Sequence, residues 1–422
     1  IGMRGNAGQS SYAASKAGAE QLCMAYQNCY SVPVFITRCH DEKTNILTKD
    51  GVKNINDVNV GDLVWTLKDN KKLKLEPIQE IFIKKDYKGE MIRFKSKKYD
   101  LLVTPEHRML TRKKYREKEY TIKKAKDLLN IGDNEKHYLP LSGEWVGKKC
   151  KYVDISKYLR KDFCTKGINK RIKIEDLMAF IGWYVSKGSY LNGTISIKTT
   201  KHKKEIKNLI KILGFKSYGG KRSVEFYSIT ILDFLAQFGN ESDNKTIPDW
   251  VLQYDKKYLM ILFNALMKES GSKLREKPYI KYYTKSKELA EKVSELVIKL
   301  GYSAGIKEWI MFNAKKLKKS KSYYVYIRKA IGPLEKENIS KTNYNGTVWC
   351  VRTSSGNFFI ERNGDIACSG NTMNNYGERQ HPEKFIPSTI KKVLAGETVI
   401  IHSNKDRTVS GSRFYIHARN TS

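Results

Sequence analysis

A chain of 422 residues is too long for one ordinary hydrophobic core, so we expect several domains. No apolar run approaches the roughly 20 residues that cross a bilayer, which argues against a membrane protein. The seven cysteines are scattered without CxxC spacing, which argues against a zinc site or a disulfide framework and favours a cytoplasmic location. The first residues resemble neither a signal peptide nor a natural start, so we expect the chain to begin within a domain.

The net charge of +35 is concentrated in the middle of the chain. Residues 1–38 carry +2 and residues 372–422 carry +4, which leaves +29 for residues 39–371. A positive excess of this size attracts phosphate backbones, so double-stranded DNA is one candidate partner. A lysine- and asparagine-rich composition from an AT-rich genome explains the same charge equally well. The charge alone does not decide between these explanations.

Residues 1–38 contain a tyrosine and a lysine at helical spacing. Tyr12 and Lys16 lie four residues apart in a stretch of small residues, which predicts that they share one face of a helix. An ammonium one turn away lowers the pKa of a phenol, so Tyr12 is a candidate general acid or base. Taken alone, this spacing occurs often by chance.

The residues on either side of the middle segment join into one pattern. The stretches PVFITR (33–38) and TMNNYGERQHPEKFIPSTI (372–390) read continuously and resemble the extended short-chain dehydrogenases, most closely the dTDP-glucose 4,6-dehydratases. The resemblance covers the 89 flanking residues. It implies α/β Rossmann-type fragments, NAD as the cofactor of the complete enzyme and a nucleotide-sugar as its substrate.

By that resemblance Tyr12 is the catalytic base and Lys16 positions the cofactor ribose. Asn374, Asn375 and Arg413 would face the nucleotide-sugar. The glycine-rich dinucleotide turn of the family is missing from this sequence, so the phosphate cradle is missing too. We therefore predict that this chain has no dehydratase activity.

Three blocks of the middle segment have the pattern of short β-strands. Residues 39–64 and 99–110 alternate apolar residues with Gly, Asn and Asp turns, and the second block contains the turn Thr104–His107. The third block runs from residue 348 to Asn371. In order and content the blocks resemble the N-terminal, Thr-x-x-His and C-terminal blocks of inteins. The resemblance implies the all-β Hedgehog/intein fold and a chain that acts on itself without a cofactor.

The resemblance gives each block a chemical role. Cys39 is the nucleophile that converts the preceding peptide bond into a thioester. Thr104 and His107 would polarise that peptide group and protonate its nitrogen. The hydroxyl of Thr372 then attacks the thioester, and Asn371 cyclises to release the middle segment. Each residue alone has an ordinary explanation, such as a buried cysteine or a structural turn; their coincidence at both edges of the interruption favours splicing.

Some positions depart from the intein pattern. Gly370 stands where a histidine is usual, Cys350 where an aspartate is frequent, and Gly356 where a histidine is frequent. The proton for Asn371 cyclisation must therefore come from elsewhere. We predict slow splicing that is limited by the asparagine step.

Residues 151–335 have a different pattern of alternating helices and strands. The segments 177–189 and 258–272 are predicted helices that both end at glycine, and small residues such as Gly182 would allow close packing. The pair resembles the dodecapeptide helices of LAGLIDADG homing endonucleases, an α+β fold. By that resemblance, predicted strands such as residues 190–197 and 279–283 would form a basic DNA-binding saddle. The acids that hold Mg²⁺ in that family are replaced by Lys187 and Ser270, so we predict a degenerate nuclease.

The main hypothesis is protein splicing that excises residues 39–371 and ligates Arg38 to Thr372. We expect five segments: dehydratase-like flanks at 1–38 and 372–422, splicing regions at 39–150 and 336–371, and a linker with the endonuclease-like domain at 151–335. Two alternatives stay open, a DNA-binding or site-specific endonuclease and an oxidoreductase fragment. The expected partner for splicing is the chain's own polypeptide. The expected partner for the endonuclease alternative is duplex DNA.

Overall fold

The computed structural model describes residues 39–113, 117, 119–132, 135–160, 168–273, 279–313, 318–371, 374–376 and 415–417. Tyr12, Lys16, Thr372 and Arg413 lie outside the described residues. For Asn374 and Asn375 only the backbone is described. The Rossmann-type fold of the flanks therefore stays a prediction.

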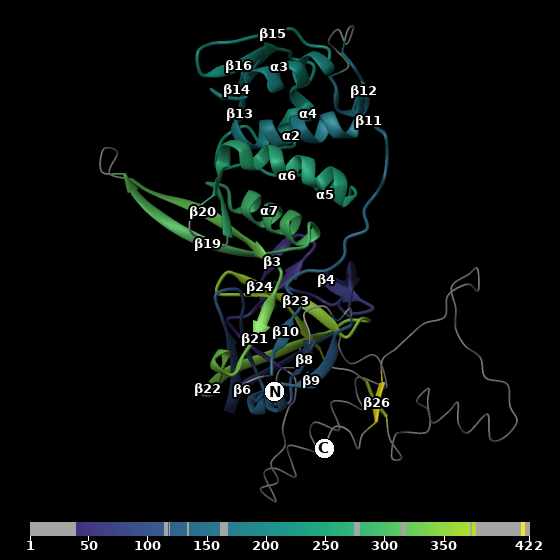
Figure 1. Cartoon of the computed structure of the whole chain (residues 1–422), viewed down its shortest axis with the longest axis vertical. Coiled ribbons are helices and arrows are strands. Elements are labelled where there is room, and N and C mark those ends of the chain that lie inside the picture. The colour runs from purple at the N-terminus through teal and green to yellow at the C-terminus, as the bar shows by residue number, and fades with distance from the viewer. Residues whose placement is uncertain are drawn as a thin grey trace, which may run out of the picture.

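The middle of the chain forms two lobes (Figure 1). In this view the lower lobe combines purple and blue strands, which come early in the chain, with yellow-green strands, which come late in the chain. The upper lobe is teal and green. The upper lobe is thus inserted between the two halves of the lower lobe.

A small closed barrel lies in the lower lobe. Its strands, in order, are β1 (His40–Asp41), β22 (Ile339–Arg352), β6 (Glu80–Lys95) and β7 (Asp100–Val103), and β1 also pairs with β7. Residues 101–103 and 348–351 are apolar and buried, as expected for strands that are covered on both faces. The all-β expectation for the splicing regions agrees with this architecture.

A ten-stranded sheet runs through both lobes. Its order is β17 (Gly271–Lys273), β18 (Tyr279–Thr284), β20 (Lys318–Lys329), β19 (Tyr302–Asn313), β24 (Asp365–Gly370), β23 (Asn357–Arg362), β2 (Asn45–Thr48), β4 (Leu63–Lys68) and β5 (Lys72–Pro77), with β3 (Gly51–Lys53) paired to β2. The strands β19 and β20 form a long ribbon that projects from the body of the molecule (Figure 1). The join between the lobes is the bridge from Gly305 in β19 to Asp365 in β24.

The remaining strands form smaller sheets. A four-stranded sheet has the order β13 (Gly188–Leu191), β14 (Thr194–Lys198), β16 (Ser223–Tyr227) and β15 (Ser217–Tyr218). Strand pairs are β8 (Arg108–Thr111) with β9 (Thr121–Lys124), β10 (His137–Leu139) with β21 (Gly332–Leu334), β11 (Tyr152–Asp154) with β12 (Arg171–Lys173), and β25 (Asn374–Tyr376) with β26 (Tyr415–His417). Short 3₁₀ segments are η1 (Ile55–Asp57), η2 (Lys126–Asn130), η3 (Ser156–Tyr158) and η4 (Lys336–Asn338).

The α-helices of the described ranges lie in the upper lobe. They are α2 (Ile174–Lys187), α3 (Lys203–Ile212), α4 (Leu232–Ala236), α5 (Asp249–Leu252), α6 (Lys256–Ser270) and α7 (Lys287–Lys299). Each of the two predicted helices ends directly before its glycine, Gly188 or Gly271. A Cβ on Gly182 would lie 2.6 Å from Cβ of Ala265, so the glycine allows α2 and α6 to approach this closely. The predicted close packing of the helices is confirmed.

One predicted strand is wrong. Residues 190–197 form a hairpin, β13 and β14, instead of a single strand. The turn contains Asn192 and Gly193, which have φ values of 48° and 81°. Such positive φ values suit an Asn-Gly hairpin turn, a signal that the sequence contained.

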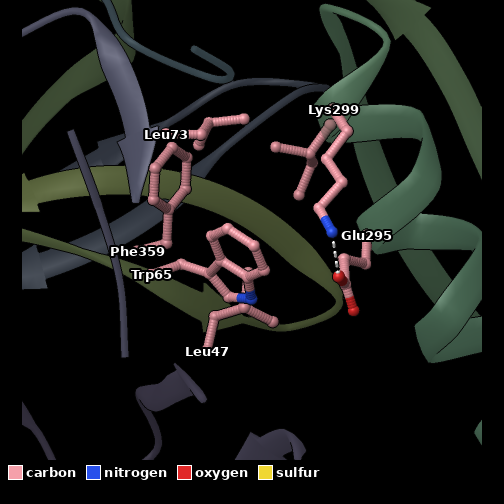
Figure 2. A pocket seen from close by; sticks show the side chains of 7 residues that line it. Leu47, Trp65, Leu73, Glu295, Lys299 and Phe359 are labelled. Atoms are coloured by element: carbon pink, nitrogen blue, oxygen red, sulfur yellow. Dashed lines mark hydrogen bonds and ion pairs between the residues drawn. The ribbon is translucent and has the colours of Figure 1, made fainter. Parts of the chain in front are cut away.

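One hydrophobic cluster spans both lobes, and a second cluster fills the barrel of the lower lobe. Leu47, Trp65 and Phe359 of the lower lobe pack in one cluster with helix residues of the upper lobe. Figure 2 shows this junction, where Lys299 of α7 points between the lobes and its ammonium binds Glu295 at 2.6 Å. The same ammonium lies 4.8 Å from the ring centre of Trp65. The aromatic face and the carboxylate together compensate a buried charge.

Within the described ranges, no helix is long and apolar enough to cross a membrane.

Candidate functional site

Cys39 lies directly before β1 at the barrel. Its side chain is buried, with 2% of its surface exposed. Its backbone N–H donates to Oγ1 of Thr104 at 3.0 Å, and the backbone N–H of Thr104 donates to the Cys39 carbonyl at 3.0 Å. The nitrogen of the peptide bond before Cys39 is therefore held by a hydroxyl group.

The Thr-x-x-His sequence forms the predicted turn between β7 and β8. The backbone N–H of His107 donates to the carbonyl of Thr104 at 2.9 Å. The next segment fastens the turn, because the N–H of Ala125 donates to the His107 carbonyl and that of Lys126 to the Pro105 carbonyl, both at 2.8 Å. These bonds fix the backbone from which the His107 side chain extends.

Asn371 follows β24 and is fully buried. Its backbone N–H donates to the carbonyl of Gly356 at 3.0 Å, and its Nδ2 donates to Oγ1 of Thr353 at 3.1 Å. The Thr353 hydroxyl donates in turn to the carbonyl of Asn357 at 2.8 Å. Among the described residues, Oδ1 of Asn371 has no hydrogen-bond partner. The carboxamide is thus oriented through its nitrogen.

One turn contacts both ends of the middle segment. Thr104 binds the backbone of Cys39, and Nε2 of His107 lies 2.8 Å from Oγ of Ser369, two residues before Asn371. The structure therefore brings Cys39, Thr104 and His107 close to the chain segment that carries Asn371.

Position 370 has no room for a side chain. A Cβ on Gly370 would lie 2.3 Å from the carbonyl oxygen of Arg108 and 3.0 Å from its carbonyl carbon. These are backbone atoms of β8, which cannot rotate away as the end of a flexible side chain can. The glycine that departs from the intein pattern is therefore required by the close approach of β8 to β24.

Burial keeps the thiol of Cys39 protonated. Burial raises its pKa above the ordinary thiol range, the neighbouring thiol of Cys350 raises it further, and the ammonium of Lys84 opposes both. The register of β1 and β22 pairs His40 with Trp349, so one further step along it sets Cys39 opposite Cys350. A reaction that starts from this thiol needs a group that accepts its proton.

Sequence reasoning missed three side chains near these ends. They are Thr353, which binds the Asn371 carboxamide, Ser369, which lies beside His107, and His40. His40 is fully buried, and its ring centre lies 4.5 Å from that of His107. Serine and threonine are too common in strands to signal such contacts, whereas a histidine in an apolar strand was a signal that we did not use.

A buried ion network ties the ends of the middle segment together. Arg362 in β23 binds both carboxylate oxygens of Asp41 at 3.0 Å and one oxygen of Asp100 at 2.9 Å. Asp100 also accepts hydrogen bonds from Arg93 and Asn363, which lower its pKa against the opposing effect of burial. Because Asp41 lies two residues after Cys39, this network fixes β1 against the strand that leads into β24.

The ends of α2 and α6 lack the donors that Mg²⁺ prefers. Oγ of Ser186 lies 2.8 Å from Oγ of Ser270, and Lys187 brings a cation to the same helix ends. Glu269 accepts a hydrogen bond from the Thr199 hydroxyl at 2.8 Å. In the described part of the chain no group of three His, Cys, Asp or Glu side chains could hold a metal ion. These helix ends do not fit a Mg²⁺ site.

No protein-family model matches the chain. Three curated proteins are similar in sequence. A DNA-directed RNA polymerase subunit beta C-terminal section from Stigeoclonium helveticum is 24% identical over 81% of this chain and 38% of its own length. An ATP-dependent Clp protease proteolytic subunit from Chlamydomonas moewusii is 22% identical over 66% of this chain and 29% of its own length. The RNA polymerase subunit Rpo1C of Methanocaldococcus jannaschii is 24% identical over 51% and 27%. The chain thus spans well under half of each relative.

Solved structures with distant similarity include inteins and a LAGLIDADG domain. The AceL NrdHF class 3 split intein has a TM-score of 0.30 and 9% identity, covering 80% of this chain and 99% of that one. The N-terminal LAGLIDADG domain of DUF199/WhiA has a TM-score of 0.25 and 14% identity, covering 37% and 75%. A DnaB intein from Synechocystis sp. PCC 6803 has a TM-score of 0.18 and 15% identity, covering 24% and 68%. Likenesses of this size say nothing about activity.

Proposed function

We propose that this chain is a self-splicing protein, an intein precursor that excises residues 39–371 and ligates Arg38 to Thr372. The observation that carries the proposal is the turn of residues 104–107. It holds the backbone of Cys39 through Thr104 and contacts the strand before Asn371 through His107. We call the peptide bond before Cys39 the first seam and the peptide bond after Asn371 the second seam.

At the first seam, the thiol of Cys39 attacks the carbonyl carbon of Arg38. The new C–S bond replaces the C–N bond, and the proton lost by the thiol ends on the released nitrogen. The Thr104 hydroxyl already binds that nitrogen through its N–H. His107 is the proposed acid that protonates it. No cofactor is needed, because the reaction exchanges an amide for a thioester within one chain.

At the second seam, Thr372 first attacks the thioester through its hydroxyl. This attack frees the Cys39 thiol and leaves Arg38 joined to the Thr372 oxygen as an ester. The Asn371 carboxamide nitrogen then attacks its own backbone carbonyl, and the C–N bond to Thr372 breaks. The freed amine of Thr372 displaces its own ester oxygen, which forms the Arg38–Thr372 peptide bond. The hydrogen bond from Nδ2 to Thr353 orients the attacking nitrogen. Because no side chain fits at position 370, the usual acid is absent from that residue. We therefore expect the asparagine step to limit the rate.

The curated relatives support the proposal. Their printed names describe RNA polymerase subunits and a protease subunit, which are proteins with unrelated activities. A sequence shared by such proteins is expected of an inserted element that is independent of the protein around it.

Intact mass after expression tests splicing directly. Under reducing conditions the 48.7 kDa chain should yield a released 333-residue segment and a ligated 89-residue product. Cys39→Ala should abolish ligation but leave the second seam cleavable, whereas Asn371→Ala should leave only thiol-induced cleavage at the first seam. Cys150→Ser is the matched control, because the carbonyl of Cys150 accepts a hydrogen bond from Tyr258 of α6 in the upper lobe. A full-length chain that persists under reducing conditions contradicts the proposal.

A second candidate function, also proposed here, is binding of double-stranded DNA by the upper lobe without cleavage. The paired helices carry Lys187 and Ser270 at their ends, and the projecting ribbon exposes Trp309 by 53%. We expect duplex binding that weakens steeply with salt, measured by mobility shift. Cutting of duplex DNA that depends on Mg²⁺ would contradict the degenerate site.

The flanks are proposed to be parts of an NAD-dependent nucleotide-sugar dehydratase. The residues that would contact NAD and the sugar, Tyr12 and Lys16 among them, lie outside the described part of the chain. NAD is the proposed cofactor of the complete enzyme, and a nucleotide-sugar is its proposed substrate.

A further inference from the structure

His40 is a buried polar side chain that forms no hydrogen bond in the described part of the chain. Its side chain is fully buried, and neither Nδ1 nor Nε2 has a partner there. Buried ring nitrogens are normally hydrogen-bonded, and exceptions are often found where a group takes part in chemistry. An apolar side chain would fill the same place at lower cost.

The surroundings of His40 are aromatic apart from one imidazole. The ring centres of Trp349 and Phe358 lie 5.4 Å and 5.7 Å from that of His40. The ring of His107 is closest, at 4.5 Å and in a T-shaped arrangement. A phenylalanine at position 40 would suit these neighbours, so packing does not explain the histidine.

His40 and His107 together connect the two seams. His40 follows the nucleophile Cys39 in the chain and contacts His107, and Nε2 of His107 lies 2.8 Å from Oγ of Ser369. Ser369 and Asn371 are alternate residues of one extended segment, so their side chains point to the same side. The contacts between the seams therefore run from the backbone of Cys39 through the turn of residues 104–107, with His40 against the His107 ring, to Ser369, two residues before Asn371.

Both seams have the same proton requirement. At each seam one proton leaves an attacking group, the thiol of Cys39 or the carboxamide of Asn371, and one proton joins a departing backbone nitrogen. A neutral imidazole carries one N–H and one lone pair, so a pair of imidazoles offers both functions at once. The usual histidine is excluded at position 370 by the carbonyl of Arg108.

We propose that His40 is the proton-exchange partner of His107, and that this histidine pair serves both seams in place of the side chain that cannot fit at position 370. The inference rests on the proposed splicing function. In each step the proton of the attacking group passes to one imidazole, while the pair returns a proton to the departing nitrogen. No proton is gained or lost overall, and no oxidant, metal or co-reactant takes part.

The charges around His40 agree with this role. Burial lowers its pKa to about 3, and the guanidinium of Arg362 lowers it in the same direction. Arg362 on β23 is itself paired with Asp41 on β1 and Asp100 on β7, and His107 on the turn is the titratable group that faces the ring. His40 is therefore neutral at physiological pH, with one nitrogen able to donate and the other to accept.

The test measures each seam alone in the full chain. Cleavage at the second seam is followed in a Cys39→Ala background, and thiol-induced cleavage at the first seam in an Asn371→Ala background, between about pH 6 and 8. His40→Phe keeps an aromatic ring but removes both nitrogens. Phe358→Leu is the matched control, because Phe358 is a ring neighbour of His40 that has no exchangeable proton.

We expect His40→Phe to slow both seams by at least about tenfold, within the usual contribution of a positioned proton carrier. The second-seam rate should also change its pH dependence: nearly flat in the parent, but falling with rising pH in His40→Phe, where His107 must take its proton from solvent. Phe358→Leu should lower the rate, if at all, without changing the shape of the profile.

Three results would overturn the inference. The first is a His40→Phe variant with rates within twofold of the parent, and the second is a loss of rate with an unchanged pH profile, as in the control. The third is full activity of His40→Gln, a variant that keeps the test possible if His40→Phe does not fold. NMR of ¹⁵N-labelled histidines in the Cys39→Ala, Asn371→Ala chain separates this inference from splicing itself. There the titration of His107 should shift when His40 is replaced, and an unshifted titration also counts against the pair.

Discussion

At the scale of single residues, Gly370 has the sharpest steric constraint of the site. Gly370→Ala should destabilise the chain by about 1–3 kcal/mol, because its Cβ would overlap the Arg108 carbonyl oxygen at 2.3 Å. Chemical denaturation in the Asn371→Ala background measures this. Gly370→His, the substitution that the intein pattern favours, should slow the second seam. A faster second seam with histidine there would show that the strand has room.

The thiol of Cys39 should give the first seam a distinct pH dependence. Because burial and Cys350 raise its pKa, the thiolate fraction increases with pH beyond the ordinary thiol range of about 9. Thiol-induced cleavage should therefore accelerate up to high pH without a plateau near neutrality. The same shift favours folding while the thiol is neutral, and this stability is lost as the pH rises above the ordinary thiol pKa. A plateau below pH 8 would contradict the buried thiol.

Acid should unfold the barrel partly through His40. Its pKa falls from 6.5 unfolded to about 3 folded, so the unfolded chain binds the extra proton below pH 6.5. Stability is fully present above pH 6.5 and is lost as the pH falls toward 3, by an amount on the order of a few kcal/mol. His40→Phe should remove this part of the pH dependence. Denaturation midpoints between pH 4 and 7 check it against Phe358→Leu.

At the scale of secondary-structure elements, Arg362 is the main link between β1, β7 and β23. Arg362→Met should destabilise the lower lobe by about 3–5 kcal/mol, because Asp41 would remain buried without a counter-charge and Asp100 would keep only Arg93. Asp41→Asn together with Arg362→Met should cost less than the two single changes added, since the pair is removed together. Additive losses would mean that the two groups act independently.

The elements were predicted from sequence to differing degrees. The helices α2 and α6 were predicted as two similar helical segments that end at Gly188 and Gly271, which are local signals. The β13–β14 hairpin was mistaken for one strand, although Asn192–Gly193 is a local turn signal. The pairing of β1 with β22 had no local signal, because it joins residues far apart in the chain.

The same difference holds for the site. Cys39, Thr104, His107 and Asn371 could be predicted because each belongs to a short sequence pattern. The contacts of Ser369 and His40 arise only when β24 and β1 meet the Thr104–His107 turn, so no stretch of sequence contains them. The steric reason for Gly370 likewise depends on β8, a separate strand.

At the scale of the whole molecule, the shared core predicts that the lobes unfold together. Trp65→Ala should cost about 3–5 kcal/mol, because Trp65 is 5% exposed and packs in the cluster that contains the helices. Hydrogen exchange should show amides of both β4 and α7 opening more readily. Protection that changes only in the lower lobe would show that the lobes are independent.

If the chain splices as proposed, the barrel also sets the time at which the reaction begins during synthesis. The indole of Trp349 binds the carbonyl of Asp41 across 308 positions of the chain, and β1 has its neighbours only in β7 and β22. A ribosome that has made Cys39 must therefore translate the chain as far as β22 before this cysteine is enclosed by the barrel. On the proposed splicing function, we expect incomplete nascent chains to be protected from premature cleavage, because the reaction needs the finished barrel.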